Sequence, residues 1–246
     1  MSIEEKWVIF DYGGTLALPS PRVTCNNLGA YFSRVLPPQQ REQFLHILQR
    51  SWEGADERGR ALGLDVSLCT ILHDVLRELN IPFVGTQHVV DSFLRQLGDG
   101  EVTPAAAAAV REIKSQGYKI GLASNTLRSS KVRIESLQRA AIADEFSAVI
   151  ISSEIGFRKP HPVFFEILLR RIGAVPEQVV FVGDTWHKDV LAPIESGMRA
   201  VWIAEGNKAA PVSVRHSVPL INDISQLPSL LAQMSMAVSA SRDVQY

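Results

Sequence analysis

Five short apolar runs of β-prone residues, each ending in glycine or polar residues, constrain the fold of this chain more than any other feature. They are Trp7–Phe10, Lys119–Ala123, Ala148–Ile151, Val179–Val182 and Ala200–Ile203. Short runs of this kind are typical of buried strands that end in loops. The last four alternate with helical segments, which favours a parallel sheet covered on both faces. We therefore expect an α/β fold with a Rossmann-like wound parallel sheet.

The helical segments between these runs carry their own start and stop signals. Thr103 followed by Pro104 and five alanines predicts a helix with an N-cap and a proline in its first turn, and Gly117 marks its end. The sequence predicts further helices over Ser130–Ala140, Pro162–Ile172 and Lys188–Ser196.

The stretch from about residue 18 to residue 100 breaks the alternation, because its apolar spacing is helical throughout. We expect a Rossmann-like core formed by residues 1–17 and 101–234, and an all-helical inserted domain over residues 18–100. Weak periodicity and several serines predict a flexible tail over residues 235–246.

The overall charge gives no case for a nucleic-acid or membrane-surface partner, because the net charge is -1. Two cysteines do not suggest a secreted disulfide scaffold. No signal-peptide pattern and no apolar run of bilayer length is present. We expect a soluble cytoplasmic protein, and the sequence leaves its oligomeric state open.

Four groups of polar residues follow four of the predicted strands, and in a wound parallel sheet such positions meet at the carboxyl edge, where ligands bind. Asp11, at the end of the first strand, is a carboxylate that can attack phosphorus. Ser124 and Asn125 can hold phosphate oxygens. Lys159 offers a positive charge, and Asp184 with Asp189 offers the hard oxygen ligands that Mg²⁺ prefers. Each group alone also fits an ordinary turn or helix cap.

Taken together, the order, spacing and strand context of these four groups resemble the haloacid dehalogenase-like superfamily, and the helical insertion matches the position of that family's cap domain. The resemblance covers about residues 3–15 and 102–204. It implies three catalytic residues (Asp11, Ser124 and Lys159), four groups around Mg²⁺ (Asp11, the Gly13 carbonyl, Asp184 and Asp189), and substrate contacts from Gly14 and Asn125. It also implies a small phosphorylated substrate and an aspartyl-phosphate intermediate.

One position departs from the pattern of the family's phosphatases, which carry a second aspartate two residues after the first. Gly13 stands there, and it has no side chain for acid–base work. A positioned general acid is worth about 10²–10⁴-fold in rate. We therefore expect a substrate with a good leaving group, an acid supplied from elsewhere, or little turnover. His161 and His187 lie in predicted loops near the site and are candidates for that acid.

One alternative function stays open, and two others are disfavoured. A catalytically weak or inactive module that binds a phosphorylated ligand or partner would explain Gly13. A 2-haloacid dehalogenase would use an aspartate nucleophile but would not require the acidic pair Asp184 and Asp189. A phosphonatase would use a lysine of the insertion, but no lysine occurs between Trp7 and Ile113.

The insertion is rich in arginine, which binds carboxylates and phosphates through two parallel hydrogen bonds. Glycines in Trp52–Arg60 interrupt the helical pattern and predict a loop that could reach the active site. Arg58, Arg60 and Trp52 are therefore our candidates for substrate selection.

Overall fold

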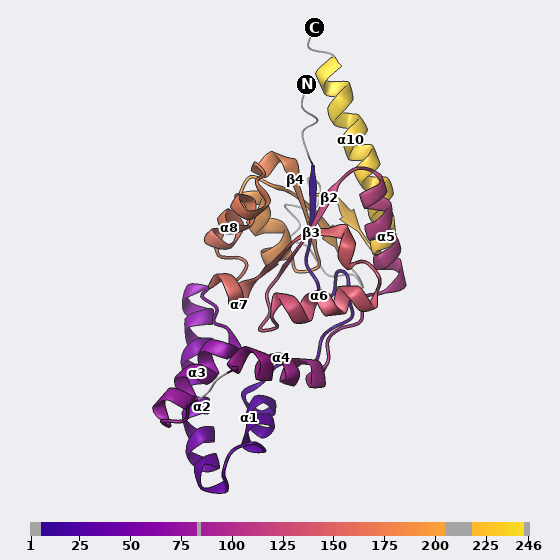
Figure 1. Ribbon diagram of the computed structural model, residues 1–246. Coiled ribbons are helices and arrows are strands. Elements are labelled where there is room, and N and C mark those ends of the chain that lie inside the picture. Colours follow the sequence, from indigo (N-terminus) through magenta and orange to yellow (C-terminus); the bar gives the residue numbers. More distant parts are fainter. Residues whose placement is uncertain (1–5, 83–84, 205–217, 244–246) are drawn as a thin grey trace.

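The computed structural model describes residues 6–82, 85–204 and 218–243, and in the last helix it describes side chains through Ser235. Positions 1–5 and 205–217 of the predicted core, and the end of the predicted tail, lie outside the described residues. Two layers of helices enclose one sheet, and a group of helices extends from one edge of that sheet (Figure 1).

Six parallel strands form the sheet in the order β3-β2-β1-β4-β5-β6. They span β1 Trp7–Phe10, β2 Lys119–Ser124, β3 Phe146–Ile151, β4 Val179–Gly183, β5 Arg199–Ile203 and β6 Leu220–Ile221. The five predicted strands are all present, and the two-residue β6 is too short to leave a signal in the sequence. Because β1 pairs with both β2 and β4, the strand order reverses at β1. The strands β2 and β3 lie on one side of it, and β4, β5 and β6 lie on the other. Ligands bind wound sheets at this kind of position.

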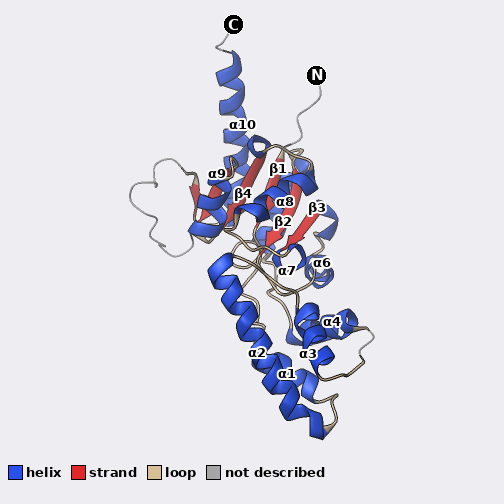
Figure 2. Ribbon diagram, turned by 90° about the vertical axis from the view of Figure 1, so that its left-hand side faces the viewer, coloured by secondary structure: helices blue, strands red, loops and turns tan. Residues whose placement is uncertain are grey.

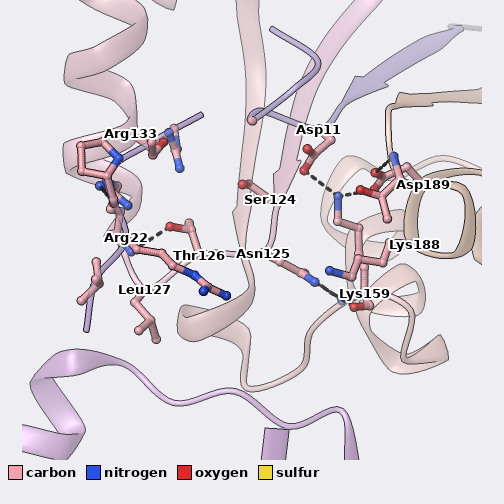
Figure 3. Close-up of a pocket in the computed structure, with 16 residues that line it drawn as sticks. Asp11, Arg22, Ser124, Asn125, Thr126, Leu127, Arg133, Lys159, Lys188 and Asp189 are labelled. Carbon is pink, nitrogen blue, oxygen red and sulfur yellow. Dashed lines mark hydrogen bonds and ion pairs between the residues drawn. The ribbon is translucent and has the colours of Figure 1, made fainter. Parts of the chain in front are cut away.

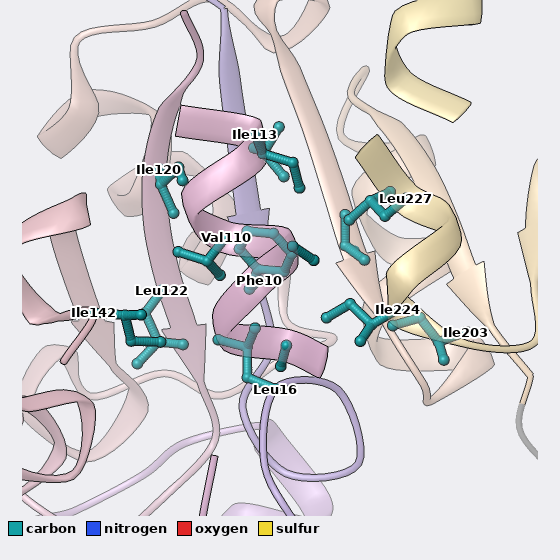
Figure 4. Close-up of a cluster of buried hydrophobic side chains, with 14 of the residues drawn as sticks. Phe10, Leu16, Val110, Ile113, Ile120, Leu122, Ile142, Ile203, Ile224 and Leu227 are labelled. Carbon is teal, nitrogen blue, oxygen red and sulfur yellow. The ribbon is translucent and has the colours of Figure 1, made fainter. Parts of the chain in front are cut away.

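Helices cover both faces of the sheet, as the apolar strands require. On one face, α5 (Pro104–Ser115), α6 (Ser130–Arg139) and α10 (Leu227–Asp243) contribute to a core that includes Phe10, Val110 and Leu227 (Figure 4). On the other face, α8 (Pro162–Ile172) and α9 (Ala192–Glu195) pack on Ile9 and Phe181. The short helix α7 (Ser152–Ile155) follows β3.

The predicted helix starts are mostly those observed. Thr103 caps α5 by accepting a hydrogen bond of 3.1 Å from the Ala106 amide, with Pro104 in the first turn. The predicted helix over Lys188–Ser196 differs, because the chain first forms a short π-helix, η3 (Trp186–Leu191), and only then the α-helix α9. Pro193 has no amide hydrogen to continue a regular α-helix through this point, which accounts for the interruption.

Helices are the only regular elements that the structure describes between residues 18 and 100. They are α1 (Cys25–Ser33), α2 (Pro38–Leu62), α3 (Leu68–Glu78) and α4 (Thr86–Leu97). They bury a separate apolar core that includes Leu48, Leu72 and Phe93. Figure 2 shows α2 reaching from the far end of this insertion to the sheet edge. There the Asp65 amide donates to the Gly156 carbonyl, and the Arg158 amide donates to the Gly63 carbonyl, each at 2.9 Å.

The predicted loop over Trp52–Arg60 is wrong, since these residues continue the helix α2. Gly59 serves a packing purpose instead. A Cβ atom at this position would lie 3.0 Å from the Arg158 guanidinium carbon, so glycine allows Arg158 to pack against the helix. The helix ends at Gly63, which adopts a left-handed conformation with φ of 64°.

The last helix, α10, continues to Asp243 and includes most of the segment for which the sequence predicted a tail. Within the part of the chain that the structure describes, no helix combines the length and the apolar character needed to cross a membrane.

Candidate active site

Asp11 directly follows the central strand β1, and its amide donates a hydrogen bond of 2.9 Å to the Val182 carbonyl of β4. A tight turn comes next, in which the Tyr12 carbonyl accepts from the Leu16 and Ala17 amides, each at 2.9 Å. The strand end and the turn fix the Asp11 backbone at the carboxyl edge of the sheet. Its carboxylate is partly exposed, with 14% of the side-chain surface accessible.

Lys159 is the buried cation of the site, with 1% of its side chain exposed. Its ammonium group donates to Asp11 Oδ1 at 2.8 Å, to Asp189 Oδ1 at 2.7 Å and to the Ala123 carbonyl at 2.8 Å. These contacts match the three hydrogens of the ammonium group. Burial lowers the pKa of Lys159, but the Asp11 and Asp189 carboxylates outweigh burial and the net shift is upward. Lys159 is therefore a fixed positive charge between two carboxylates.

Asp189 lies in the π-helix η3 and is 1% exposed. Its second oxygen accepts a hydrogen bond of 3.0 Å from the Thr185 amide. Burial raises the pKa of Asp189 to about 6, while the Lys159 ammonium opposes this rise and the Asp11 carboxylate adds to it. Gly183 makes room for Asp189, because a Cβ atom on Gly183 would lie 2.3 Å from the Asp189 Cβ.

Asp184 is held from two sides. Gly14, at φ of +78°, lies so close that a Cβ atom there would be 2.8 Å from Asp184 Oδ2. The Trp202 indole donates a hydrogen bond of 3.0 Å to the Asp184 backbone carbonyl. Gly14 and Trp202 therefore restrict where the Asp184 carboxylate can lie.

Asp11, Asp184 and Asp189 form an acidic group in which one oxygen atom from each residue lies within 4.8 Å of the others. Carboxylate oxygens at this spacing suit a hard cation such as Mg²⁺, which takes one or two protein carboxylates and completes its shell with water and phosphate oxygens. The donor set therefore fits the predicted Mg²⁺, with Asp11, Asp184 and Asp189 as the side chains that would hold it.

Asp11 and Asp189 of this group, but not Asp184, line a pocket of about 360 Å³ (Figure 3). Five cationic side chains line it, and the two carboxylates of Asp11 and Asp189 accompany them. The cations are Arg22, Arg128, Arg133, Lys159 and Lys188. Ser124, buried at the end of β2, also lines the pocket, and within the described residues no hydrogen bond of its hydroxyl is found. The excess of positive charge suits an anionic ligand.

Most of the predicted site residues come together here, since the pocket is lined by Asp11, Gly13, Ser124, Asn125, Lys159 and Asp189. Asn125 uses its side-chain amide on the Lys159 backbone rather than leaving it free for a ligand. Gly14 is not among the lining residues, and its amide donates to the Ala17 carbonyl at 2.8 Å. Its position indicates a role in placing Asp184.

Arg58 and Arg60 do not line this pocket, so the structure does not bring them to the place where the sequence predicted substrate contacts. Both belong to the helix α2, and Arg60 forms an ion pair with Asp56 on the surface. Arg58 lines a separate depression with Arg50 and Asp74. Because both residues belong to a regular helix, their side chains point outward from α2. The prediction required a loop that could carry them to the active site.

The two histidine candidates do not line the pocket either. His161 caps α8 by accepting a hydrogen bond from the Val163 amide, and its ring packs on Phe157. His187 is exposed on η3.

Sequence reasoning missed four cations of the pocket: Arg22, Arg128, Arg133 and Lys188. Lys188 stands next to Asp189, and Arg128 stands four residues after Ser124, so proximity to recognised motifs was an available signal for both. Arg22 and Arg133 gave no such signal, because only the fold brings them to the site.

The fold and the site define the class as an α/β protein with a wound parallel sheet, which carries an acidic group and a buried lysine at its carboxyl edge. The profile of the family described as haloacid dehalogenase-like hydrolase matches residues 5–197, and the chain belongs to this family.

Two relatives match about half of this chain. A glyceraldehyde 3-phosphate phosphatase of Methanothermobacter thermautotrophicus is 36% identical over 52% of this chain and 58% of its own length. A phosphoserine phosphatase of Thermus thermophilus is 33% identical over 49% of this chain and 47% of its own length. The chain therefore spans about half the length of these relatives.

A phosphoglycolate phosphatase of Yersinia pseudotuberculosis is 26% identical over 85% of both chains. Among solved structures, a 2-haloacid dehalogenase from Pseudomonas syringae superposes with a TM-score of 0.62 at 24% identity, covering 94% of this chain and 99% of the other. At this identity the likeness supports the fold alone.

Proposed function

We propose that this chain is a Mg²⁺-dependent phosphatase that acts on a small phosphorylated metabolite through an aspartyl-phosphate on Asp11. One observation carries the proposal. Asp11, at the end of the central strand, lies 2.8 Å from the buried Lys159 ammonium and within 4.8 Å of acidic oxygens of Asp184 and Asp189. The proposal is supported by this arrangement, because a carboxylate at a strand end, a buried cation and two further carboxylates lie close together.

The charge of the pocket supports a phosphorylated ligand, because cationic side chains outnumber carboxylates among its lining residues. The relatives support the same conclusion from an independent direction, since their names describe phosphatases of three different substrates. They share phosphate ester hydrolysis and differ in the rest of the substrate.

The side chains have distinct roles in the proposed reaction. Asp11 attacks phosphorus, the bond to the substrate oxygen breaks, and the phosphoryl group is carried as an acyl phosphate on Asp11. Water then attacks phosphorus, which releases inorganic phosphate and restores the Asp11 carboxylate. Lys159 and the Ser124 hydroxyl stabilise negative charge on the phosphoryl oxygens. Mg²⁺ bound by Asp11, Asp184 and Asp189 would neutralise further phosphate charge.

Gly13 limits the choice of substrate. The leaving oxygen departs with the electron pair of the broken bond and needs a proton, and neither Gly13 nor the two histidine candidates offers one within the pocket. A substrate whose leaving group is already a weak base needs this proton least. We therefore propose a substrate with a good leaving group, and the helical insertion acts as the cap over it.

The test is hydrolysis of p-nitrophenyl phosphate by the wild type and by Asp11→Asn, each with and without Mg²⁺. The leaving group of p-nitrophenyl phosphate is a weak base, so hydrolysis of this substrate should depend least on an acid at position 13. Turnover that requires Mg²⁺ and disappears in Asp11→Asn is the expected result. A folded protein that binds phosphate without turnover would favour the alternative of a non-catalytic phosphate-binding module, which Gly13 also fits.

A further inference from the structure

Two arginines in the wall of the pocket are almost completely buried and have no part in the chemistry proposed at Asp11. Arg128 is 4% exposed and Arg133, on α6, is 2% exposed. Burying a guanidinium group is costly unless an opposite charge and hydrogen bonds compensate for it. We therefore compare the charge of these two arginines with the opposite charge and the hydrogen bonds that surround them.

One carboxylate serves both arginines. Asp99 lies 2.7 Å from Arg133 Nη1 and 3.2 Å from Arg128 Nε. The Tyr12 ring lies 3.5 Å from the Arg133 guanidinium carbon and adds a cation–π contact, which offsets only part of the second charge. Within the described residues, Arg133 Nε is buried without a hydrogen-bond partner. The cluster therefore retains an unbalanced positive charge at the pocket wall.

Structural contacts account for Arg128 and for part of Arg133, but not for Arg22. Arg128 Nη2 donates to the Pro21 and Gly98 carbonyls, each at 2.8 Å, and so joins the two chain segments that connect the insertion to the core. Arg133 ties α6 to the second of these segments through Asp99, but its Nε stays without a hydrogen-bond partner among the described residues. Arg22 adds a third guanidinium, exposed in the segment between Ala17 and α1, and no partner of its side chain is found in the described part of the chain.

The position of these groups separates them from the phosphoryl end. Figure 3 shows Arg22 and Arg133 on one side of the pocket and Asp11, Lys159 and Asp189 on the other, with the loop from Ser124 to Leu127 between them. A ligand whose phosphoryl group lies at Asp11 would extend its remaining atoms toward the arginines.

We propose that Arg22, Arg128 and Arg133 form a second anion subsite, so that the substrate is a small phosphate ester with a second anionic group, a carboxylate or another phosphate. Guanidinium groups bind either anion in bidentate fashion. The second anion would supply the charge that Asp99 alone does not. The inference rests on the proposed function only in placing the phosphoryl group at Asp11.

Binding of non-hydrolysable phosphonates tests the subsite without requiring turnover. Isothermal titration in the presence of Mg²⁺ compares propylphosphonate, whose tail is neutral, with 3-phosphonopropionate and ethane-1,2-diphosphonate, whose tails carry a carboxylate and a second phosphonate. We expect at least one anionic tail to tighten binding by about tenfold or more, the effect of one charge-assisted hydrogen bond. The better of the two tails identifies which anion the subsite takes.

Two variants and a control connect this preference to the subsite. Arg22→Gln removes an exposed charge without disturbing the buried cluster, and Arg133→Lys keeps the buried charge but loses the planar fork. Both should lower the affinity ratio of anionic to neutral tail several-fold. Arg34→Gln removes another exposed arginine, which lies outside the pocket, and should leave the ratio unchanged.

A ratio near one in the wild type, or the same ratio in all variants, would overturn the inference. If p-nitrophenyl phosphate is nevertheless hydrolysed in an Asp11-dependent manner, the subsite fails while the proposed function stands. If none of the three phosphonates binds while hydrolysis still depends on Asp11, only the subsite fails, and if neither binding nor hydrolysis is found, both proposals fail.

Discussion

Asn125 and Lys159 exchange two hydrogen bonds of 2.8 Å, in which the Asn125 side-chain amide donates to the Lys159 carbonyl and the Lys159 amide donates to Asn125 Oδ1. The pair joins the loop after β2 to the segment that precedes α8. Because the backbone of Lys159 is held in this way, its ammonium group is placed between Asp11 and Asp189.

Asn125→Ala should therefore lower kcat more than it raises KM, because Lys159 loses its fixed position. It should also lower the free energy of unfolding by about 1–3 kcal/mol, since the part-buried Lys159 amide and carbonyl lose their partner. Steady-state kinetics and urea unfolding measure the two effects. Gln49→Ala, which removes an exposed side-chain amide on α2, is the control. Lower stability with unchanged kcat would leave Asn125 a purely structural residue.

Gly13→Asp should restore the missing general acid. A Cβ atom at this position meets nothing within 4 Å, so the backbone leaves room for a side chain, and the residue already lines the pocket. We expect hydrolysis of alkyl phosphates to rise relative to aryl phosphates by as much as about 10²–10⁴-fold. Gly13→Asn has nearly the same shape but cannot transfer the proton. An unchanged alkyl-to-aryl ratio in Gly13→Asp would contradict our account of the missing acid.

Trp202→Phe should weaken Mg²⁺ binding while keeping most of the apolar packing. The substitution removes the indole donor that holds the Asp184 carbonyl but retains an aromatic ring beside Trp186. Loss of a group that orients a metal ligand typically costs about 10–100-fold in metal affinity. The Mg²⁺ concentration that gives half-maximal activity should rise accordingly. Trp52→Phe, on α2, should not shift it.

Asp99→Asn should destabilise the fold in a pH-dependent way. Burial raises the pKa of Asp99, but Arg133, Ser136, Ser20 and Arg128 together outweigh burial and hold this pKa below its ordinary value. A lowered pKa in the folded state means that the carboxylate stabilises the fold above its unfolded pKa near ~4, and that this contribution disappears as the pH falls through the lower folded pKa.

At pH near 7, removing the charge should cost about 3–5 kcal/mol, because Arg128 and Arg133 lose their shared partner. The difference from the wild type should shrink as the pH falls below ~4. Urea unfolding across this range measures it, with the exposed Asp144→Asn as the control. A difference that does not vary with pH would mean that the carboxylate charge is not what stabilises the cluster.

Local pattern sufficed wherever the determining interactions are local. The strand bounds, the Thr103 cap and the order of the polar groups after the strands follow from residue type and spacing over a few positions. The convergence of Asp11, Ser124, Lys159 and Asp189 was also predictable, since parallel strands bring their carboxyl ends to one edge. The same local reading failed for residues 52–60, where glycine meets a packing demand from Arg158.

The sequence by itself determined the wound sheet, the inserted helices and the residues of the acidic centre, because periodicity and strand-end position encode them. Only the tertiary structure decided that Arg22, Arg128 and Arg133 share a pocket wall, that Trp202 holds Asp184, and that Arg58 and Arg60 stay outside. The physical reason is that these contacts depend on which surfaces of distant elements pack together. The spacing of residues in the sequence carries no information about which of these surfaces meet.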